Sequence, residues 1–246
     1  MIPALILILL LGWVCGCVVN YVCDVMPFSR KLTAPICVSC EAKQSWADYL
    51  LFRSCKECGK PRSLRTWIVQ AAGVLGCTYL WFFPPKALGF WIALILSIYF
   101  AIVMVMDLEY RVVLNPISVV GVVIGLGVGI KLHGWLALAG GATGFAAMLL
   151  LYYAGDWYAR RLAKKRGEEL EEVALGFGDV NLMGILGLIL GFPGVFLGLM
   201  AGILLGGAAS IIVLVVQSIR KQYQPFTAIP YAPFLVLGTI LLLFPA

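Results

Sequence analysis

Apolar residues along this chain gather into eight runs, and short polar segments separate the runs. A helix needs roughly 20 predominantly apolar residues to cross a bilayer, and most of the runs approach that length. The pattern therefore predicts an all-α polytopic membrane protein with about eight transmembrane helices. The predicted helices cover residues 2–22, 66–83, 87–106, 113–132, 134–153, 180–192, 194–217 and 228–244.

The break between the sixth and seventh runs decides the number of crossings. Gly191-Phe192-Pro193-Gly194 lies between them and is typical of a tight turn. A single helix over residues 180–217 would instead give seven crossings and move the C-terminus to the other side of the membrane.

The positions of lysine and arginine favour eight helices. With residues 24–65 in the cytoplasm, 16 of the 18 basic residues and all 12 acidic residues fall on the cytoplasmic side. This satisfies the positive-inside rule with both termini outside, whereas seven helices would put Arg220 and Lys221 on the outer face. No basic segment precedes the first run and no small-residue cleavage site follows it, so it predicts a first helix and not a signal peptide.

The composition agrees with a protein that lies within membrane lipids. The chain has 246 residues, is 62% hydrophobic and has a mean hydropathy of +1.00, which excludes a soluble domain with one apolar segment. The net charge of +6 follows from the topology, so no nucleic-acid partner is predicted. We expect a single polytopic domain over residues 1–246.

Four cysteines in the first cytoplasmic segment, residues 24–65, are spaced as a metal site. Cys37 and Cys40 form one CxxC pair, Cys55 and Cys58 form a second, and 14 residues lie between the pairs. Two such pairs suit tetrahedral coordination of Zn²⁺ by four thiolates, and a reducing cytoplasm disfavours disulfides. A closed site of four cysteines is structural, so we expect zinc to stabilise a zinc-binding loop between the first two helices. Free or redox-active thiols are the alternative.

The second cytoplasmic segment, residues 155–178, places a basic block before an acidic block. This order is typical of a solvated helix with i,i+4 ion pairs whose basic end faces anionic lipid head groups. Docking of a substrate onto the acidic block is the alternative. Asp156, at the start of the segment, is predicted to end the fifth helix at the water boundary.

Two aspartates lie where an apolar chain rarely tolerates them. Asp107 ends the third run, and Asp179 opens the sixth. A carboxyl group at the hydrocarbon boundary costs free energy and marks a candidate functional site. The topology puts both at the cytoplasmic ends of their helices, hence at one depth. Gly176 and Gly178 would leave the backbone beside Asp179 open to an extended substrate.

Two adjacent carboxyls hold one proton between them, because both cannot easily ionise side by side. The ionised member can take a proton from water while the protonated member donates to a scissile carbonyl oxygen. This predicts an aspartic endopeptidase at the membrane surface. Ion-coupled transport and a non-catalytic zinc-bearing membrane scaffold are the alternatives. The location at one surface, and not at mid-bilayer, favours hydrolysis over transport.

Three other ionisable residues near the ends of the helices have lesser roles in this interpretation. Arg111 would pair with Asp107 only on a helix that continued past it, and Pro116 limits such a helix. Glu109 would face elsewhere on that helix. The single histidine, His133, lies on the opposite side of the membrane.

Taken together, these residues resemble the type IV prepilin peptidases, a family of bifunctional leader peptidases and N-methyltransferases. Gly176-Phe177-Gly178-Asp179 resembles the family's GxGD aspartic protease motif, and Asp107 resembles its partner aspartate. The two CxxC pairs match the form that carries both activities. Further similarity lies in Pro230–Leu235, which resembles a Pro-x-x-Pro-Phe segment, and in Gly16, Asn20 and Pro27 of the first helix.

The resemblance implies an enzyme that removes the basic leader of type IV prepilins or pseudopilins after a glycine. Cleavage would occur at the cytoplasmic face of the bacterial plasma (inner) membrane. The resemblance also implies methylation of the new N-terminus with S-adenosylmethionine. Neither composition nor spacing indicates that methylation, and no residue is assigned to it.

The chain departs from the family pattern at four places. Asn181 replaces a Lys, Gln70 replaces a Glu, Val25 replaces an Arg, and Leu114-Asn115-Pro116 replaces Leu-Pro-Asp. The aspartate pair is intact, so the resemblance still implies proteolysis. Gln70 is the departure expected to weaken recognition or methylation.

Overall fold

The computed structural model describes residues 2–166, 176–219 and 230–245. Within these ranges the elements are α-helices, with one isolated β-bridge between Ile36 and Lys43. The predicted all-α class is therefore confirmed. The chain divides into two compact units, unit 1 over residues 1–105 and unit 2 over residues 106–245, and each is described by itself.

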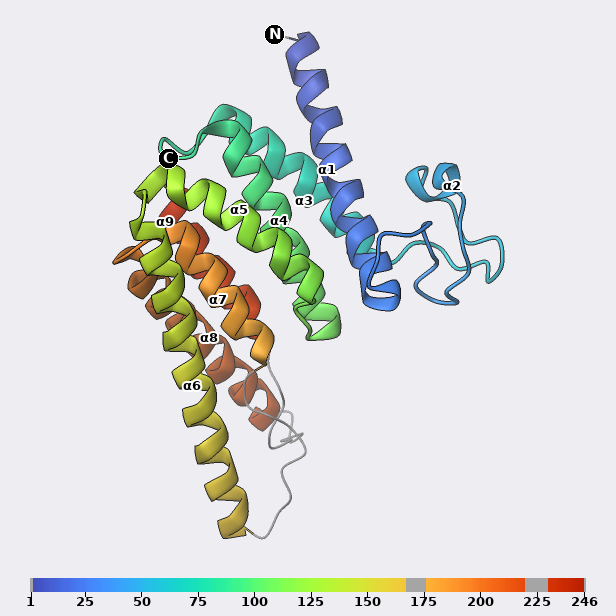
Figure 1. Cartoon of the computed structure of the whole chain (residues 1–246). Coiled ribbons are helices and arrows are strands. Elements are labelled where there is room, and N and C mark those ends of the chain that lie inside the picture. Colours follow the sequence, from blue (N-terminus) through green and yellow to red (C-terminus); the bar gives the residue numbers. More distant parts are fainter. Residues whose placement is uncertain (1, 167–175, 220–229, 246) are drawn as a thin grey trace. The chain divides into compact units, whose positions relative to one another are not determined.

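In unit 1 the helices α1 (Ile2–Ser29) and α3 (Leu64–Phe82) pack closely against each other. The unit also contains α2 (Trp46–Leu50) and most of α4 (Gly89–Tyr110), as Figure 1 shows. Glycines let α1 and α3 approach, because a Cβ on Gly12 would lie 2.8 Å from the Cα of Val74. Membrane helices commonly use small residues in this way.

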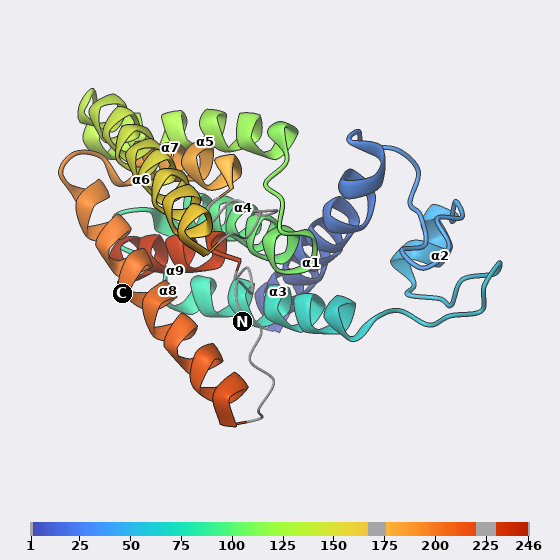
Figure 2. The same cartoon turned by 90° about the horizontal axis from the view of Figure 1, so that it is seen from below.

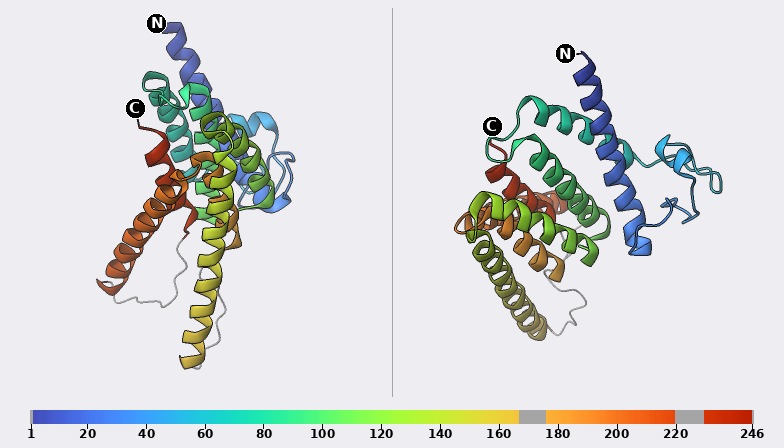
Figure 3. Two further views of the ribbon diagram at one scale, coloured as in Figure 1. Left: turned by 60° about the vertical axis from the view of Figure 1, so that its left-hand side comes forward. Right: turned by 45° about the horizontal axis from the view of Figure 1, so that its top comes forward.

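Unit 2 is arranged around one short helix. It contains α5 (Asn115–His133), α6 (Leu136–Arg166), α7 (Phe177–Leu190), α8 (Gly194–Ile219) and α9 (Ala232–Leu243). α7 packs against the other four helices, and nine of its 14 residues are buried (Figures 1 and 2). The C-terminal ends of α6 and α8 extend beyond α7 and lie apart from each other (Figure 3).

A helix forms at each of the eight predicted positions in the described part of the chain. Five of them are long and apolar enough to cross a membrane, namely α1, α4, α5, α6 and α8, and α7 and α9 are shorter apolar helices. α3, at the second predicted position, is helical over 19 residues but is not among these candidate spans. Gly191, with a φ of 64°, ends α7, and α8 begins at Gly194. The predicted break between the sixth and seventh helices is thus confirmed.

The first helix ends later than its predicted bound. α1 continues through Pro27 to Ser29, seven residues past the predicted end at residue 22. Proline removes one backbone hydrogen bond, but two others keep the last turn helical. The Ser29 hydroxyl donates to the carbonyl oxygen of Val25 at 2.9 Å, and the Arg30 N–H donates to that of Met26 at 2.9 Å.

The prediction that Asp156 ends the fifth helix is wrong. That helix, α6, continues to Arg166. Asp156 forms an i,i+4 ion pair with Arg160 at 2.9 Å, and the Arg161 guanidinium lies 3.8 Å from the centre of the Trp157 ring. Both contacts stabilise the helical extension. The acidic block, within residues 167–175, lies outside the described residues.

Candidate functional site

The two aspartates predicted to be catalytic lie at helix ends within unit 2. Asp107 is in the last turn of α4 and is 5% exposed, and Asp179 is in the first turn of α7 and is 8% exposed. The two carboxyls lie within electrostatic reach of each other. The fold therefore brings together two buried acidic groups from distant parts of the chain.

The start of α7 places Asp179 beside the free N–H groups of a helix N-terminus. Gly176, in an extended conformation, is the N-cap residue, and its carbonyl oxygen accepts the Asp179 N–H at 3.0 Å. A carboxylate in the first turn is stabilised by the helix dipole. The backbone N–H of Gly176 also interacts with the Asp179 carboxylate, so the residue before the helix holds this side chain at the start of α7.

Asp107 is held by the last helix of the chain. The backbone N–H of Ala232, at the start of α9, donates to Oδ2 of Asp107 at 3.1 Å. Helix N-termini leave such N–H groups without partners inside the helix. Tyr231, the N-cap residue of α9, makes no side-chain cap bond, so Asp107 supplies the cap from α4.

The Pro-x-x-Pro-Phe segment thus contributes to the site, which the motif alone did not indicate. Besides Ala232, it brings Tyr231 close enough to Asp179 for an electrostatic interaction. The Tyr231 ring packs against α8, where a Cβ on Gly206 would lie 2.8 Å from the ring's Cε2. The resemblance of this segment to the family's was the one sequence signal for its importance.

Arg111 does not continue the helix that carries Asp107. α4 ends at Tyr110, and Arg111 has a φ of 53° with its N–H bonded to the Asp107 carbonyl oxygen at 2.9 Å. Arg111 is therefore not in the helical conformation that an i,i+4 ion pair with Asp107 would need. The guanidinium acts on the Asp107 carboxyl through longer-range electrostatics.

The two glycines beside Asp179 differ in their surroundings. A Cβ on Gly176 would meet Oδ2 of Asp179 at 3.6 Å, which is an ordinary contact. A Cβ on Gly178 would lie 3.0 Å from the Cβ of Val113, so Gly178 allows the start of α7 to pack closely on the segment before α5. An open approach for a substrate backbone at these glycines stays a prediction.

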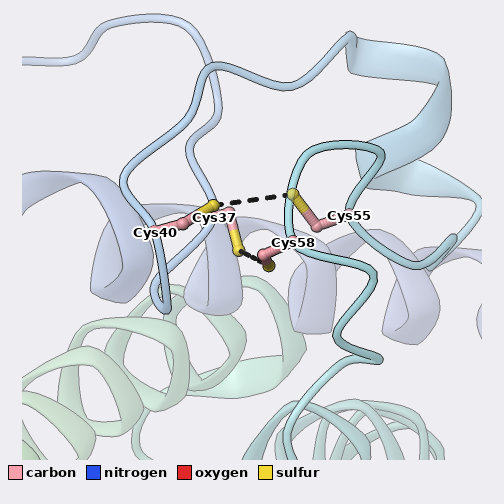
Figure 4. Close-up of side chains that lie close together, drawn as sticks. All are labelled: Cys37, Cys40, Cys55 and Cys58. Carbon is pink, nitrogen blue, oxygen red and sulfur yellow. Dashed lines mark hydrogen bonds between the residues drawn. The ribbon is translucent and has the colours of Figure 1, made fainter.

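Unit 1 brings together the four cysteines predicted as metal ligands. Their sulfur atoms all lie within 4.8 Å of one another, with 3.8 Å between Cys37 and Cys58 and 3.7 Å between Cys40 and Cys55 (Figure 4). Four sulfurs at about 2.3 Å from a tetrahedral Zn²⁺ would be about 3.8 Å apart. A disulfide requires about 2.05 Å. The cluster therefore has the dimensions of a metal site and could hold one ion.

Each cysteine pair lies in the same kind of turn. In the first, Cys37 accepts the N–H of Glu41 at 2.7 Å, and in the second, Cys55 accepts the N–H of Gly59 at 2.9 Å. Glu41 and Gly59 have φ values of 58° and 69°. The N–H of Cys58 also lowers the pKa of Cys55 to about 6, which favours the thiolate that metals bind.

A short helix between the two pairs is anchored by a charged residue. Ser45 caps α2 by accepting the N–H of Asp48 at 3.2 Å. The Lys56 ammonium, 2.6 Å away, lowers the pKa of Asp48 to about 2, and Ser45 and Arg53 act in the same direction. The sequence pattern did not predict α2.

One comparison with known proteins finds a similarity to a family. Residues 94–211 match the sequence model of the type IV leader peptidase family. The matched range contains both aspartates and extends from α4 into α8. No curated protein and no solved structure matches the chain.

Proposed function

We propose that this chain, whose residues 94–211 belong to the type IV leader peptidase family, is a membrane aspartic endopeptidase. The family assignment inferred from the sequence is confirmed, and the family together with five potential spans indicates a leader-peptidase-type membrane protein. The observation that supports the catalytic assignment is the pairing of buried Asp107 with buried Asp179.

The two aspartates would divide the chemistry between them. Asp107 accepts an N–H bond from Ala232, and Asp179 lies at a helix N-terminus, so each has a neighbour that suits the ionised form. The roles therefore belong to the pair: the ionised member would take a proton from the attacking water, and the protonated member would donate to the scissile carbonyl oxygen. Water attacks directly, and no acyl-enzyme forms.

We further propose the substrate and the place of the reaction. The enzyme would remove the basic leader of type IV prepilins or pseudopilins after a glycine, at the cytoplasmic face of the bacterial inner membrane. This rests on the resemblance of the Gly176–Asp179 motif and on the distribution of basic residues.

The cysteine cluster supports a structural zinc ion, which Cys37, Cys40, Cys55 and Cys58 would bind. The zinc-binding form of the family also suggests N-methylation of the cleaved product with S-adenosylmethionine. We assign none of the described residues to that cofactor.

The intact mass of a prepilin co-expressed with this protein tests the proposal. We expect the wild type to remove the leader and to add one methyl group, whereas Asp107→Asn and Asp179→Asn leave the leader in place. Asp156→Asn is the matched control, because this carboxylate pairs on the helix surface with Arg160. Normal cleavage by either variant of the pair would refute the catalytic assignment. Leader loss without methylation would restrict the function to the peptidase.

A further inference from the structure

Unit 1 contains a second group of buried charges, which the peptidase chemistry does not use. Asp24, near the end of α1, is 1% exposed. It accepts a 2.5 Å hydrogen bond from the Tyr49 hydroxyl and an ion-paired bond from Arg65, and Arg62 lies 3.6 Å away. This cluster ties α1, α2 and α3 together around one carboxylate.

Arg62 is the member of this cluster whose bonding is incomplete. Its side chain is 9% exposed and lies between Asp24, the Tyr49 ring at 4.1 Å, and Gln44, whose Oε1 accepts Nη2 at 2.8 Å. The Nε–H is buried and has no hydrogen-bond partner among the described residues. A buried guanidinium N–H without a partner is unfavourable.

Arg62 also lines a cavity of about 100 Å³, together with residues of both cysteine turns and of the start of α3. Arg53 and Lys60 line it too, and Asp24 is the one carboxylate in the lining. Arg53 pairs with Asp48, and Asp24 is already paired with Arg65. Lys60 has no ion-pair partner in the described part of the chain. Two of the lining residues therefore carry donors without a partner within the described ranges, the Lys60 ammonium and the Arg62 Nε–H.

We propose that this cavity binds a small oxyanion of the phosphate type. A volume of about 100 Å³ holds roughly three waters, or one group of a few heavy atoms. Arginine and lysine together are the usual donors to such groups, arginine through its planar fork and lysine as a point charge. The first-turn residues Ser63 and Thr66 of the α3 N-terminus also line the cavity, and that end of a helix favours an anion.

Lys60 and Arg62 could instead balance the negative charge of the zinc site, and the experiment must distinguish this role from anion binding. Cys37 and Cys55 line the same cavity, and a Zn²⁺ ion with four thiolates carries two negative charges. If Lys60 and Arg62 only balanced that charge, an added anion would gain nothing from them. If they form an anion site, the anion binds to the zinc-loaded protein and depends on both residues.

The experiment measures the melting temperature of the full-length, zinc-loaded protein in detergent, with phosphate replacing chloride at constant ionic strength. Phosphate stabilises folded proteins in general by exclusion from their surface, so the readout is the difference between variants. We expect a saturable rise for the wild type and, for Lys60→Gln, an apparent phosphate affinity about tenfold weaker. Lys43→Gln, an exposed cation in the same loop that does not line the cavity, should respond as the wild type does.

Arg62→Lys is a second variant, which retains the positive charge but removes the planar guanidinium. Its melting temperature should also rise less with phosphate than that of the wild type. Equal phosphate responses of the wild type, Lys60→Gln and Lys43→Gln would overturn the proposal. The source of the oxyanion is distinguished by repeating the titration in phosphatidylglycerol nanodiscs. A response lost there but present in detergent identifies a lipid headgroup phosphate, and a response in both identifies a free anion.

Discussion

Gln70 in α3 illustrates how a single buried amide accounts for a departure from the family pattern. Its Nε2 donates to the Trp13 carbonyl oxygen at 2.7 Å, and its Oε1 accepts the Cys17 thiol at 3.9 Å. A glutamate could make the first bond only when protonated. Gly16 faces the same amide, with a Cβ position only 2.6 Å from Oε1. The departure thus has a packing reason, and an effect on recognition or methylation stays a prediction.

Asp24 should be the carboxylate on which the stability of unit 1 depends most strongly. Asp24→Asn would leave the buried guanidinium groups of Arg62 and Arg65 without a counter-charge, and breaking such a pair costs about 3–5 kcal/mol. Asp156→Asn breaks an exposed pair with Arg160 and should cost about 0.5 kcal/mol or less. Thermal melting of both purified variants measures the difference, and shifts of similar size would contradict this account.

The two cysteine turns offer a matched pair of backbone substitutions. Glu41 and Gly59 both have positive φ, a conformation that costs a residue with a Cβ roughly 1–2 kcal/mol. No atom lies within 4 Å of a Cβ on Gly59, so only the backbone opposes a substitution there. We expect Glu41→Gly to strengthen zinc retention against a chelator and Gly59→Glu to weaken it. The same direction of change in both variants would rule out this explanation.

At the scale of elements, hydropathy and turn residues were enough to predict where the membrane helices lie. The helix ends were harder, because they depend on single contacts such as the Asp156–Arg160 pair that lengthens α6. The five-residue helix α2 carries no apolar period, and its cap at Ser45 is its main local signal. Local patterns therefore predict the long elements, while specific side-chain contacts set their limits.

The contact between α6 and α7 depends on particular glycines, and the sequence alone does not show which glycines are needed for close packing. A Cβ on Gly187 would lie 2.4 Å from the carbonyl oxygen of Gly140, whereas nothing lies within 4 Å of one on Gly207. Gly187→Ala should therefore push α7 away from α6 and cost about 1–3 kcal/mol. Gly207→Ala should be neutral or stabilise α8 by about 0.5–1 kcal/mol.

Melting temperature and prepilin cleavage of the two glycine variants provide the measurement. Because α7 carries Asp179, we expect Gly187→Ala to lower cleavage together with stability. Gly207→Ala should retain both. A Gly187→Ala protein that melts and cleaves like the wild type would show that α6 and α7 tolerate a wider separation.

At the scale of the whole molecule, the sequence could suggest which residues lie near one another, but not the hydrogen bonds that fix their positions. The prediction that Asp107 and Asp179 lie on the same side of the membrane followed from counting crossings. The bond from Ala232 to Asp107 joins residues 125 positions apart, and no local pattern encodes it. The cysteine cluster was predictable because its ligands repeat within a short segment. The division into two units was not, since α4 runs across the boundary without a break.

The orientation of the chain in the membrane is the remaining property that charge alone predicts. The break at Gly191–Gly194 supports two separate helices, but α7 has 14 residues and spans about 21 Å, less than the roughly 30 Å of a hydrocarbon core. Flanking residues must therefore complete that crossing, or the bilayer must thin near the Asp179 end of α7. Eight crossings put both termini outside and residues 220–221 inside, whereas seven would reverse the side of every residue after α8.

Reporter fusions at two points distinguish these topologies. We expect green fluorescent protein to be fluorescent when fused after Ile219, at the end of α8, and alkaline phosphatase to be active when fused after Pro245. A phosphatase insertion at Lys86, between α3 and α4, is the control for an outer position, because its side is the same in both topologies. Active phosphatase after Ile219 would establish seven crossings and put Arg220 and Lys221 outside against the positive-inside rule. It would also show that α7 and α8 together cross the membrane once, with their break inside the bilayer.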